Sequence, residues 1–300
     1  MASSVRITDE DIARYQRDGA VLIKGALEPD AVHLLETGVE EVYRQLGRRY
    51  TSLRSASGEG ETSVREYVTQ DSPSLRSLVD SGVVGEMGAA LMQTSSAQLV
   101  LDQVFYKTRG PIVPTPWHQD TPFLRVRGNE LIRLWFPCDC SPRQLTVQVV
   151  RGSHRWNVVY NTSGERPNET MLIASASKSD PNGVGDVLLP PVPDIARYRD
   201  SFDILSWDVE PGDALAFQGN MLHGADGHPG HDRPRRAFAV MLGGPNLRYH
   251  TPKGKAFPTP GKVQGLKLDA IPDGAPIGNH QNAFPLCWQA AARETLPAGH

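Results

Sequence analysis

The sequence has little of what marks the specialised classes of protein. It has only three cysteines, Cys138, Cys140 and Cys287. An odd number of cysteines without a C-x-x-C pair excludes a disulfide framework and a zinc knuckle. No run of 18 apolar residues could form a membrane-spanning helix, and the opening MASSVRITDEDIARYQ lacks the apolar segment of a signal peptide. We therefore expect a soluble, cytoplasmic protein without a membrane partner.

An excess of charge of either sign is also absent. The formal net charge is −3 and the isoelectric point is near 6.3, so the chain has no basic footprint for a nucleic-acid partner. Hydrophobic residues make up 39% of the 300 residues, which is enough for a sizeable core. Because all-β domains often reach about 200–250 residues as one unit, we predict a single domain over residues 1–300 without a linker.

The first third of the chain, about residues 8–95, carries helical patterns. Thr8 and Asp11 have the spacing of a capping box, which predicts a short helix before the strand-like AVLIKG. Apolar residues at helical spacing predict one amphipathic helix over 28–46 and a second over 75–92. The small, polar stretch 51–65 is predicted to be a long surface loop, either a lid or disordered.

From about residue 97 to 245 the pattern changes to short apolar or alternating runs. Gly, Pro, Asp and Asn separate these runs, which are AQLVLDQVFY, LIRLWFPCDC, LTVQVV, DALAFQ and RAFAVMLGG. Several short strands with turn signals favour a β-sandwich or jelly roll over a βαβ protein. The tail 251–300 contains 13 Pro and Gly residues and is predicted to be irregular. Its apolar side chains should pack it on the body: Phe257, Leu266, Leu268, Ile271, Phe284 and Trp288.

A histidine and a carboxylate stand two positions apart in TPWHQDTPF, residues 115–123. On a strand, residues i and i+2 project from one face, so His118 and Asp120 are predicted to converge. A third ligand from another strand would complete a 2-His-1-carboxylate facial triad for non-haem Fe(II). Nine His and 34 Asp or Glu in 300 residues produce about one H-x-[DE] pair by chance, so a structural, hydrogen-bonded histidine is the alternative.

Another histidine and two arginines follow in FQGNMLHGADGHPGHDRPRRAFAVML, residues 217–242. If the strands on either side of this turn pair, Arg235 or Arg236 lies beside His223 in the same cavity. A cation there would suit a dicarboxylate with one end on a metal and the other held by the guanidinium. The alternative is that both arginines are surface charges flanking the turn.

These segments together resemble the phytanoyl-CoA dioxygenase-like branch of the Fe(II)/2-oxoglutarate-dependent oxygenases. The similar segments are WHQD, LIRLWFPCDC, VVRGSHRW, DVEPGDALAF, LHGADGH…RPRRA and the N-terminal RYQRDGAVLIKGALEPDAV. The resemblance covers about residues 8–250 and implies a double-stranded β-helix, a cupin-like jelly roll with flanking helices. It implies that Fe(II) binds His118, Asp120 and His223. It also implies that the guanidinium of Arg235 binds 2-oxoglutarate. Three further side chains are implied to face this co-substrate, namely Trp135, Gln103 and Lys107.

The turn before the two arginines is one residue longer than the family pattern. Arg235 is preferred as the clamp, because an alanine follows the pair as in the family, and Arg236 is the alternative. His154, in the GSH segment, is interpreted as a structural turn residue hydrogen-bonded to backbone. His228 and His231 are interpreted as solvated.

The resemblance further implies that 2-oxoglutarate and dioxygen are consumed, and that succinate and CO2 are released as a C–H bond of a small molecule is oxidised. Hydroxylation is the default outcome, but desaturation, epimerisation and cyclisation use the same iron. A halogenase is excluded because it needs a small residue in place of Asp120, and a zinc or manganese cupin because no H-x-H pair occurs. A catalytically silent, ligand-binding jelly roll is the remaining rival. Nothing basic and extended suggests a grip for CoA, so we expect a natural-product-like substrate, while the oligomeric state stays open.

Overall fold

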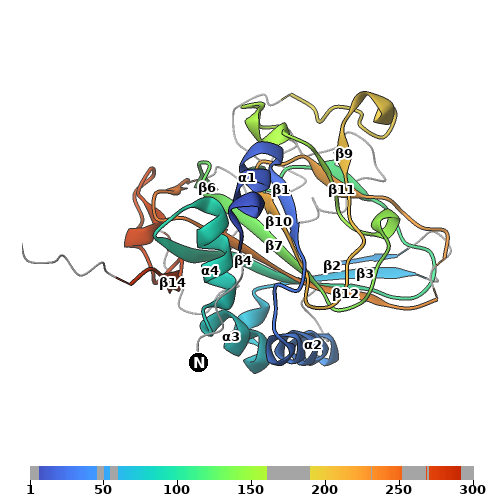
Figure 1. The fold of residues 1–300 in the computed structure, drawn as a ribbon, viewed down its shortest axis with the longest axis horizontal. Helices are drawn as coiled ribbons and strands as arrows, with labels where there is room; N and C mark the ends of the chain where they lie inside the picture. Colours follow the sequence, from blue (N-terminus) through green and yellow to red (C-terminus); the bar gives the residue numbers. More distant parts are fainter. Residues whose placement is uncertain are drawn as a thin grey trace, which may run out of the picture.

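The computed structural model describes residues 7–45, 51–54, 60–160, 190–230, 232–251, 268 and 270–291 (Figure 1). Its α-helices are α1 (Asp9–Asp18), α2 (Pro29–Arg44), α3 (Pro73–Asp80) and α4 (Val83–Met92). Its strands are β1 (Ala20–Ile23), β2 (Thr51–Arg54), β3 (Glu61–Glu66), β4 (Ser96–Lys107), β5 (Thr115–His118), β6 (Val126–Arg127), β7 (Leu131–Pro137), β8 (Gln148–Val150), β9 (Ile204–Leu205), β10 (Ala214–Gln218), β11 (His223–Ala225), β12 (Arg235–Gly243), β13 (Arg248–Tyr249) and β14 (Leu286–Gln289).

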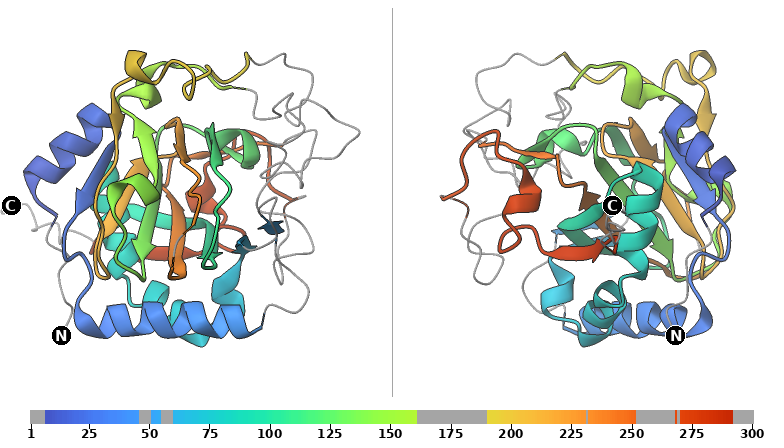
Figure 2. Two further views of the ribbon diagram at one scale, coloured as in Figure 1. Left: turned by 90° about the vertical axis from the view of Figure 1, so that its right-hand side faces the viewer. Right: turned by 60° about the vertical axis from the view of Figure 1, so that its left-hand side comes forward.

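Two antiparallel sheets build the body and confirm the predicted jelly roll. The major sheet has the order β1-β10-β7-β12-β4-β3-β2, and β14 also pairs with β4. The minor sheet has the order β5-β11-β8-β9, and its strands face the viewer in the left view of Figure 2. Strands β1 and β14, from opposite ends of the described chain, therefore lie in one sheet.

Alternation along the strands of the major sheet separates a helix side from a barrel side. On β7, Ile132, Leu134 and Phe136 join the core cluster that packs under the helices. Successive residues of a strand face opposite sides, so Arg133 and Trp135 face the barrel. Polar side chains on the barrel face of a buried strand need partners there, and these partners define the site described below.

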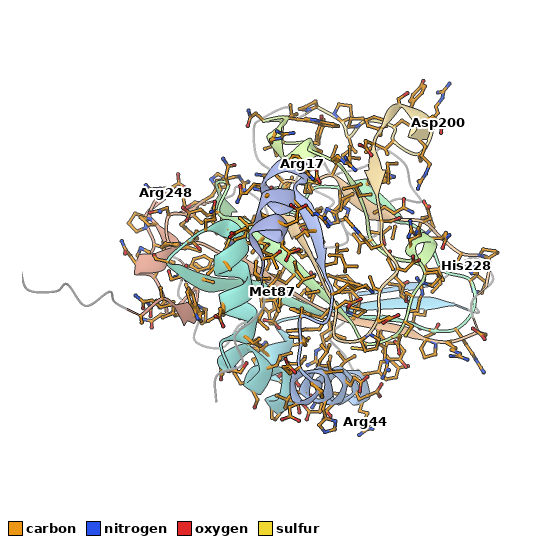
Figure 3. All side chains as sticks on the ribbon, viewed as in Figure 1. Arg17, Arg44, Met87, Asp200, His228 and Arg248 are labelled. Carbon is orange, nitrogen blue, oxygen red and sulfur yellow. The ribbon has the colours of Figure 1, made fainter. Side chains whose placement is uncertain are left out.

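Helices α2, α3 and α4 lie on the side of the major sheet away from β9 and β11 (Figure 1). Met87 of α4 is fully buried between helix and sheet (Figure 3), and burial of such a side chain contributes about 1.5–3 kcal/mol. The capping box at the start of α1 is confirmed, since the Thr8 hydroxyl accepts from the Asp11 amide and the Asp11 carboxylate accepts from the Thr8 amide. None of the helices in the described ranges combines the length and apolar character needed to cross a membrane.

The prediction of one helix over 75–92 was wrong, whereas α2 confirms the helix predicted over 28–46. The segment contains two helices, because the chain turns at Ser81 and Gly82 between α3 and α4. Gly82 has φ of +84°, a left-handed conformation that glycine adopts without the cost of a Cβ clash. The apolar pattern runs on through this turn because both helices bury one face against the same core.

The prediction of a surface loop over 51–65 was also wrong. Strands β2 and β3 pair with each other, and β3 pairs with β4, so this segment extends the major sheet. Residues 62–65 are buried although only Val64 among them is apolar. Polar side chains at buried positions hid the strand from a reading of hydrophobic alternation, and residues 55–59 of the predicted lid lie outside the described residues.

The described part of the tail is packed as predicted but is less irregular than predicted. Leu268, Ile271 and Phe284 are buried in a core cluster beside β4, and Trp288 is partly buried. Strand β14 adds a hydrogen-bonded strand to β4, which the Pro- and Gly-rich composition did not indicate. Phe257 and Leu266, which were also expected to pack, lie outside the described residues.

Candidate functional site

The minor sheet brings His118, Asp120 and His223 to one point inside the barrel. His118, the last residue of β5, lies directly opposite His223, the first residue of β11, in the antiparallel ladder. Oδ1 of Asp120 is 3.8 Å from Nε2 of His118 and 3.7 Å from Nε2 of His223. One ligand atom from each of the three lies within 4.8 Å of the others, and all three side chains are buried. The predicted convergence is confirmed.

The reason given for the convergence was wrong in one respect. Asp120 does not continue the strand, because β5 ends at His118 and Asp120 has a helical backbone (φ −78°, ψ −35°) at the start of a 3-10 turn. The carboxylate therefore reaches the site from a turn rather than from the same strand face. Pro122 in that turn favours this bend, since proline is tolerated in the first turn of a helix.

Each imidazole is held in the tautomer that suits a metal ligand. Nδ1 of His118 lies 2.8 Å from the Pro116 carbonyl, and Nδ1 of His223 lies 3.0 Å from the Met221 carbonyl. When Nδ1–H donates to a carbonyl, the lone pair of Nε2 is left for a metal. Burial, reinforced by the neighbouring His223, lowers the pKa of His118 to about 3, and burial also lowers the pKa of His223. Both rings are thus neutral at ordinary pH.

An ionised carboxylate completes the donor set. Burial opposes ionisation of Asp120, but its pKa is lowered overall, and the charge of the Arg133 guanidinium is the largest lowering cause, with a hydrogen bond from the same group beside it. Nε of Arg133 donates to Oδ2 of Asp120 at 2.9 Å, and Arg133 is itself buried. Two neutral nitrogens and one carboxylate oxygen are the donors of a facial triad, so these residues fit Fe(II).

Arg133 was missed in the sequence. The sequence did contain an indication, because Arg133 interrupts the apolar run LIRLWF. It stands two residues before Trp135 on the same strand, so both side chains lie on the inner face of this buried strand. A buried charge of this kind is rare unless it has a partner. The carboxylate of Asp120 is that partner, but sequence alone does not show which of the 34 acidic residues it is.

Gln119 and Thr121 flank the carboxylate ligand and anchor its backbone. The Gln119 amide donates to the carbonyls of Val158 and Asn220 at 3.0 and 2.8 Å. The Thr121 hydroxyl donates to the Gly219 carbonyl at 3.1 Å. Because residues 219 and 220 lead into β11, these bonds tie the segment that bears Asp120 to the segment that bears His223.

The two adjacent arginines at the start of β12 point to opposite sides. Arg236 lies on the helix side and pairs with Asp139 at 2.8 Å and Glu40 at 2.6 Å. Arg235 lies on the barrel side and is buried, with Nη1 donating to the Leu145 carbonyl. Its Nε and Nη2 are buried and have no hydrogen-bond partner among the described residues. Two orphaned donors on one guanidinium fit a carboxylate ligand.

The three other residues expected around the co-substrate also lie on inner faces of the major sheet. Lys107 is opposite Arg235 in the ladder, and burial together with Arg235 lowers the pKa of Lys107 to about 8. Oε1 of Gln103 accepts from Nη2 of Arg133 at 2.9 Å. Trp135 is partly buried and packs against the cluster that lines the minor sheet. The residues at these positions converge on the same interior as the triad.

Two other histidines for which the sequence made a prediction make contacts with the backbone. His154 confirms the structural interpretation, since its Nε2 lies 3.3 Å from the Gln16 carbonyl. His228 lies at the edge of the molecule (Figure 3), where its Nδ1 accepts from the Gly230 amide. His231 lies outside the described residues.

Comparison with known proteins agrees with this geometry. The model of the family described as phytanoyl-CoA dioxygenase (PhyH) matches residues 15–237. No curated protein sequence matches this chain.

Solved structures of three proteins share the fold at low identity. The epimerase SnoN from nogalamycin biosynthesis is 20% identical, with a TM-score of 0.66 over 93% of this chain and 98% of that one. The carbocyclase SnoK from the same biosynthesis is 18% identical, with a TM-score of 0.65 over 94% and 96%. EctD from S. alaskensis is 15% identical, with a TM-score of 0.62 over 86% and 84%. Because the family match spans most of the jelly roll and every element of the site, the chain belongs to the phytanoyl-CoA dioxygenase family of Fe(II)- and 2-oxoglutarate-dependent oxygenases.

Proposed function

We propose that this protein oxidises a C–H bond of a small, natural-product-like molecule, most simply by hydroxylation, and converts 2-oxoglutarate and dioxygen to succinate and CO2. One observation carries the proposal. The buried His118, Asp120 and His223 share the inside of the barrel with Arg235, whose Nε and Nη2 have no hydrogen-bond partner in the described part of the chain and could bind an anion. A silent binding protein has no need to keep both halves of this arrangement.

His118, Asp120 and His223 would hold Fe(II). When bound, Fe(II) with 2-oxoglutarate supplies the activation of dioxygen that the oxidation of a C–H bond requires. The protein keeps the three donors correctly protonated and limits the access of water. The ring of Phe217 lies 4.8 Å from that of His223, and the ring of Phe123 lies 6.2 Å from that of His118. These apolar rings shield the imidazoles from water.

Arg235 would bind the carboxylate of 2-oxoglutarate that is remote from the metal. Lys107, opposite Arg235, adds a second positive charge for the dianion, while Trp135 and Gln103 shape the adjoining wall. Removing one partner of such a buried ionic contact costs about 2–5 kcal/mol, much of it the penalty of leaving the other charge buried and unpaired.

The architecture of this site is compatible with several reaction outcomes, of which hydroxylation is the simplest. The similar structures include an epimerase, a carbocyclase and an EctD complex with 5-hydroxyectoine, so one architecture serves several outcomes. Two of them belong to the biosynthesis of nogalamycin, which favours a natural-product-like substrate here. Epimerisation, desaturation and cyclisation are the alternative outcomes of the same site.

The test compares matched variants of the two arginines. Arg235→Ala should weaken binding of 2-oxoglutarate to Co(II)-loaded protein by about thirty- to several-thousand-fold. Arg236→Ala should leave that affinity nearly unchanged, because Arg236 pairs on the helix side. Calorimetry measures both affinities. If neither variant loses affinity, 2-oxoglutarate is not bound as proposed, and if Arg236→Ala alone loses it, the assignment of the clamp is wrong.

The substrate is found by a screen. Metabolites of the natural-product class are incubated with the Fe(II)-loaded protein and 2-oxoglutarate, and succinate release that depends on the added metabolite is measured. His118→Ala is the matched control, because it should release none. A protein that binds Fe(II) and 2-oxoglutarate but releases no succinate with any class of compound would support the silent alternative.

A further inference from the structure

Arg133 reaches the carboxylate ligand from the side opposite the imidazoles. Its Nε donates to Oδ2 of Asp120 at 2.9 Å, and its Nη2 lies 3.3 Å from Oδ1. Oδ1 is also the oxygen that faces Nε2 of both histidines. One carboxylate is therefore shared between a permanent cation and the place where a metal ion would bind.

The side chains of Arg133 and Asp120 are each only 9% exposed, so water screens their charges weakly. A guanidinium is a permanent cation in proteins. Nη2 of Arg133 also donates to Gln103, which fixes the fork between β4 and β7. A positive charge is thus held permanently within hydrogen-bond distance of a metal-ligand atom.

Resting on the proposed function, we propose that Arg133 is a positioning residue that lowers the affinity of the site for the divalent metal and raises its affinity for the 2-oxoglutarate dianion. A fixed cation beside the ligand set repels a second cation and attracts an anion, and both effects have the same Coulombic origin. The shared carboxylate also neutralises less of the charge of a bound metal, which strengthens the attraction for the anion.

A competing effect of Arg133 would raise the affinity of the site for the metal instead of lowering it. Outer partners that orient a ligand commonly raise metal affinity by about 10–100-fold. Here, however, the backbone of Asp120 is already anchored by Gln119 and Thr121, which bond to the segment before β11. The orientation of the carboxylate depends less on Arg133 for that reason, and the charge effect dominates.

The test measures the two affinities separately. Arg133→Gln should tighten Co(II) binding by about tenfold and weaken binding of 2-oxoglutarate to the Co(II)-loaded protein by about tenfold, each about 1.4 kcal/mol. Competition with a chromophoric chelator measures the first constant, and calorimetry measures the second. Arg133→Lys keeps the charge but loses the bidentate fork, so both constants should shift in the same directions as in Arg133→Gln but by less.

Arg65→Gln is the matched control. Arg65, on β3, is as buried as Arg133 and pairs with Asp71 at 2.6 Å. This ion pair lies away from the triad, so Arg65→Gln should change neither the affinity for Co(II) nor that for 2-oxoglutarate. A purely structural Arg133 would weaken both affinities together, and that result, or no change in either, overturns the proposal. If Arg133→Gln does not fold, Gln103→Glu adds a negative charge against Nη2 and should shift both constants in the same directions as Arg133→Gln. Failure of the unmodified protein to bind Co(II) or 2-oxoglutarate would instead contradict the proposed function.

Discussion

Among the three metal-ligand candidates, Asp120 differs because it also neutralises a buried arginine. His118→Ala and His223→Ala remove neutral rings, whereas Asp120→Ala leaves Arg133 buried without its carboxylate. Breaking a buried ion pair from one side costs about 3–5 kcal/mol. All three variants should lose metal binding and turnover, but only Asp120→Ala should lower the free energy of unfolding of the metal-free protein by about that amount.

Urea denaturation of the metal-free variants measures this difference. Asp120→Asn is the accompanying variant, since it keeps the size of the side chain while removing its charge. Equal stability of Asp120→Ala and His118→Ala would mean that the ion pair contributes little to the fold.

The pKa of Lys107 predicts a dependence on pH. It is lowered from 10.5 to about 8 in the folded protein, so between these values the unfolded chain binds the proton that the folded chain has lost. The contribution of Lys107 to stability therefore increases as the pH rises through that window. Affinity for 2-oxoglutarate should change in the opposite direction, because a neutral lysine no longer attracts the dianion.

Calorimetry with Co(II)-loaded protein at about pH 7 and about pH 9 checks the binding side of this prediction. The loss of affinity at the higher pH should be larger for the unmodified protein than for Lys107→Met, which has no charge to lose. The same loss in both proteins would show that another group titrates.

At the site, the convergence of three side chains could be expected from the sequence, but their neighbours could not. The pairing of His118 with Asp120 was inferred from their spacing, whereas His223 and the choice of Arg235 over Arg236 were inferred from the resemblance to the family. The turn that carries Asp120 could not be predicted, because an HQD segment is compatible with either a strand or a 3-10 turn. The contact of Arg133 with Asp120 depends on tertiary packing, which local spacing does not encode.

At the scale of elements, the contact between α4 and β14 predicts that Gly85→Ala lowers stability, whereas helix propensity alone predicts that it raises stability. Gly85 is the third residue of α4, where helix propensity favours alanine over glycine by up to about 1 kcal/mol. A Cβ at Gly85 would lie 2.6 Å from Cβ of Trp288 and 2.9 Å from the backbone carbon of Cys287. Overpacking against backbone costs about 1–3 kcal/mol, so Gly85→Ala should be destabilising overall.

Thermal and urea unfolding measure this effect. Gly230→Ala is the control, because a Cβ at Gly230 meets no atom of the described residues within 4 Å, so its stability should change little. Stabilisation by Gly85→Ala would show that β14 can move away from α4 without cost.

Alternation and turn residues predicted the central strands well, since β4, β7, β10 and β12 each bury one face under apolar helices. Elements with a different source of stability were missed. The hairpin of β2 and β3 consists mostly of polar residues, and β14 is held by pairing to β4 in a segment rich in proline and glycine. Both owe their form to a neighbouring strand, which is a long-range effect.

For the whole molecule, the order of motifs along the chain was more informative than any single motif. The metal motif, the Pro-Gly-Asp turn and the arginine pair occur in the order found in the family that the chain resembles, and the family match over residues 15–237 confirms that resemblance. The double-stranded β-helix was expected from this resemblance. The substrate could not be predicted, because the same architecture occurs in similar structures named for different reactions.

Because His118 pairs with His223 across two strands, metal binding reports when these strands pair during folding. Strand β5 pairs only with β11 among the described strands, and the two imidazoles lie opposite each other in that ladder. A slip of one residue would turn one ring to the other face. Pairing across so many intervening residues closes a long loop, which is slow. In stopped-flow refolding, Co(II) absorbance should therefore appear after the far-ultraviolet circular dichroism signal. The delay between the two signals measures how late β5 reaches its register. Simultaneous signals would show that β5 docks together with the rest of the sheet.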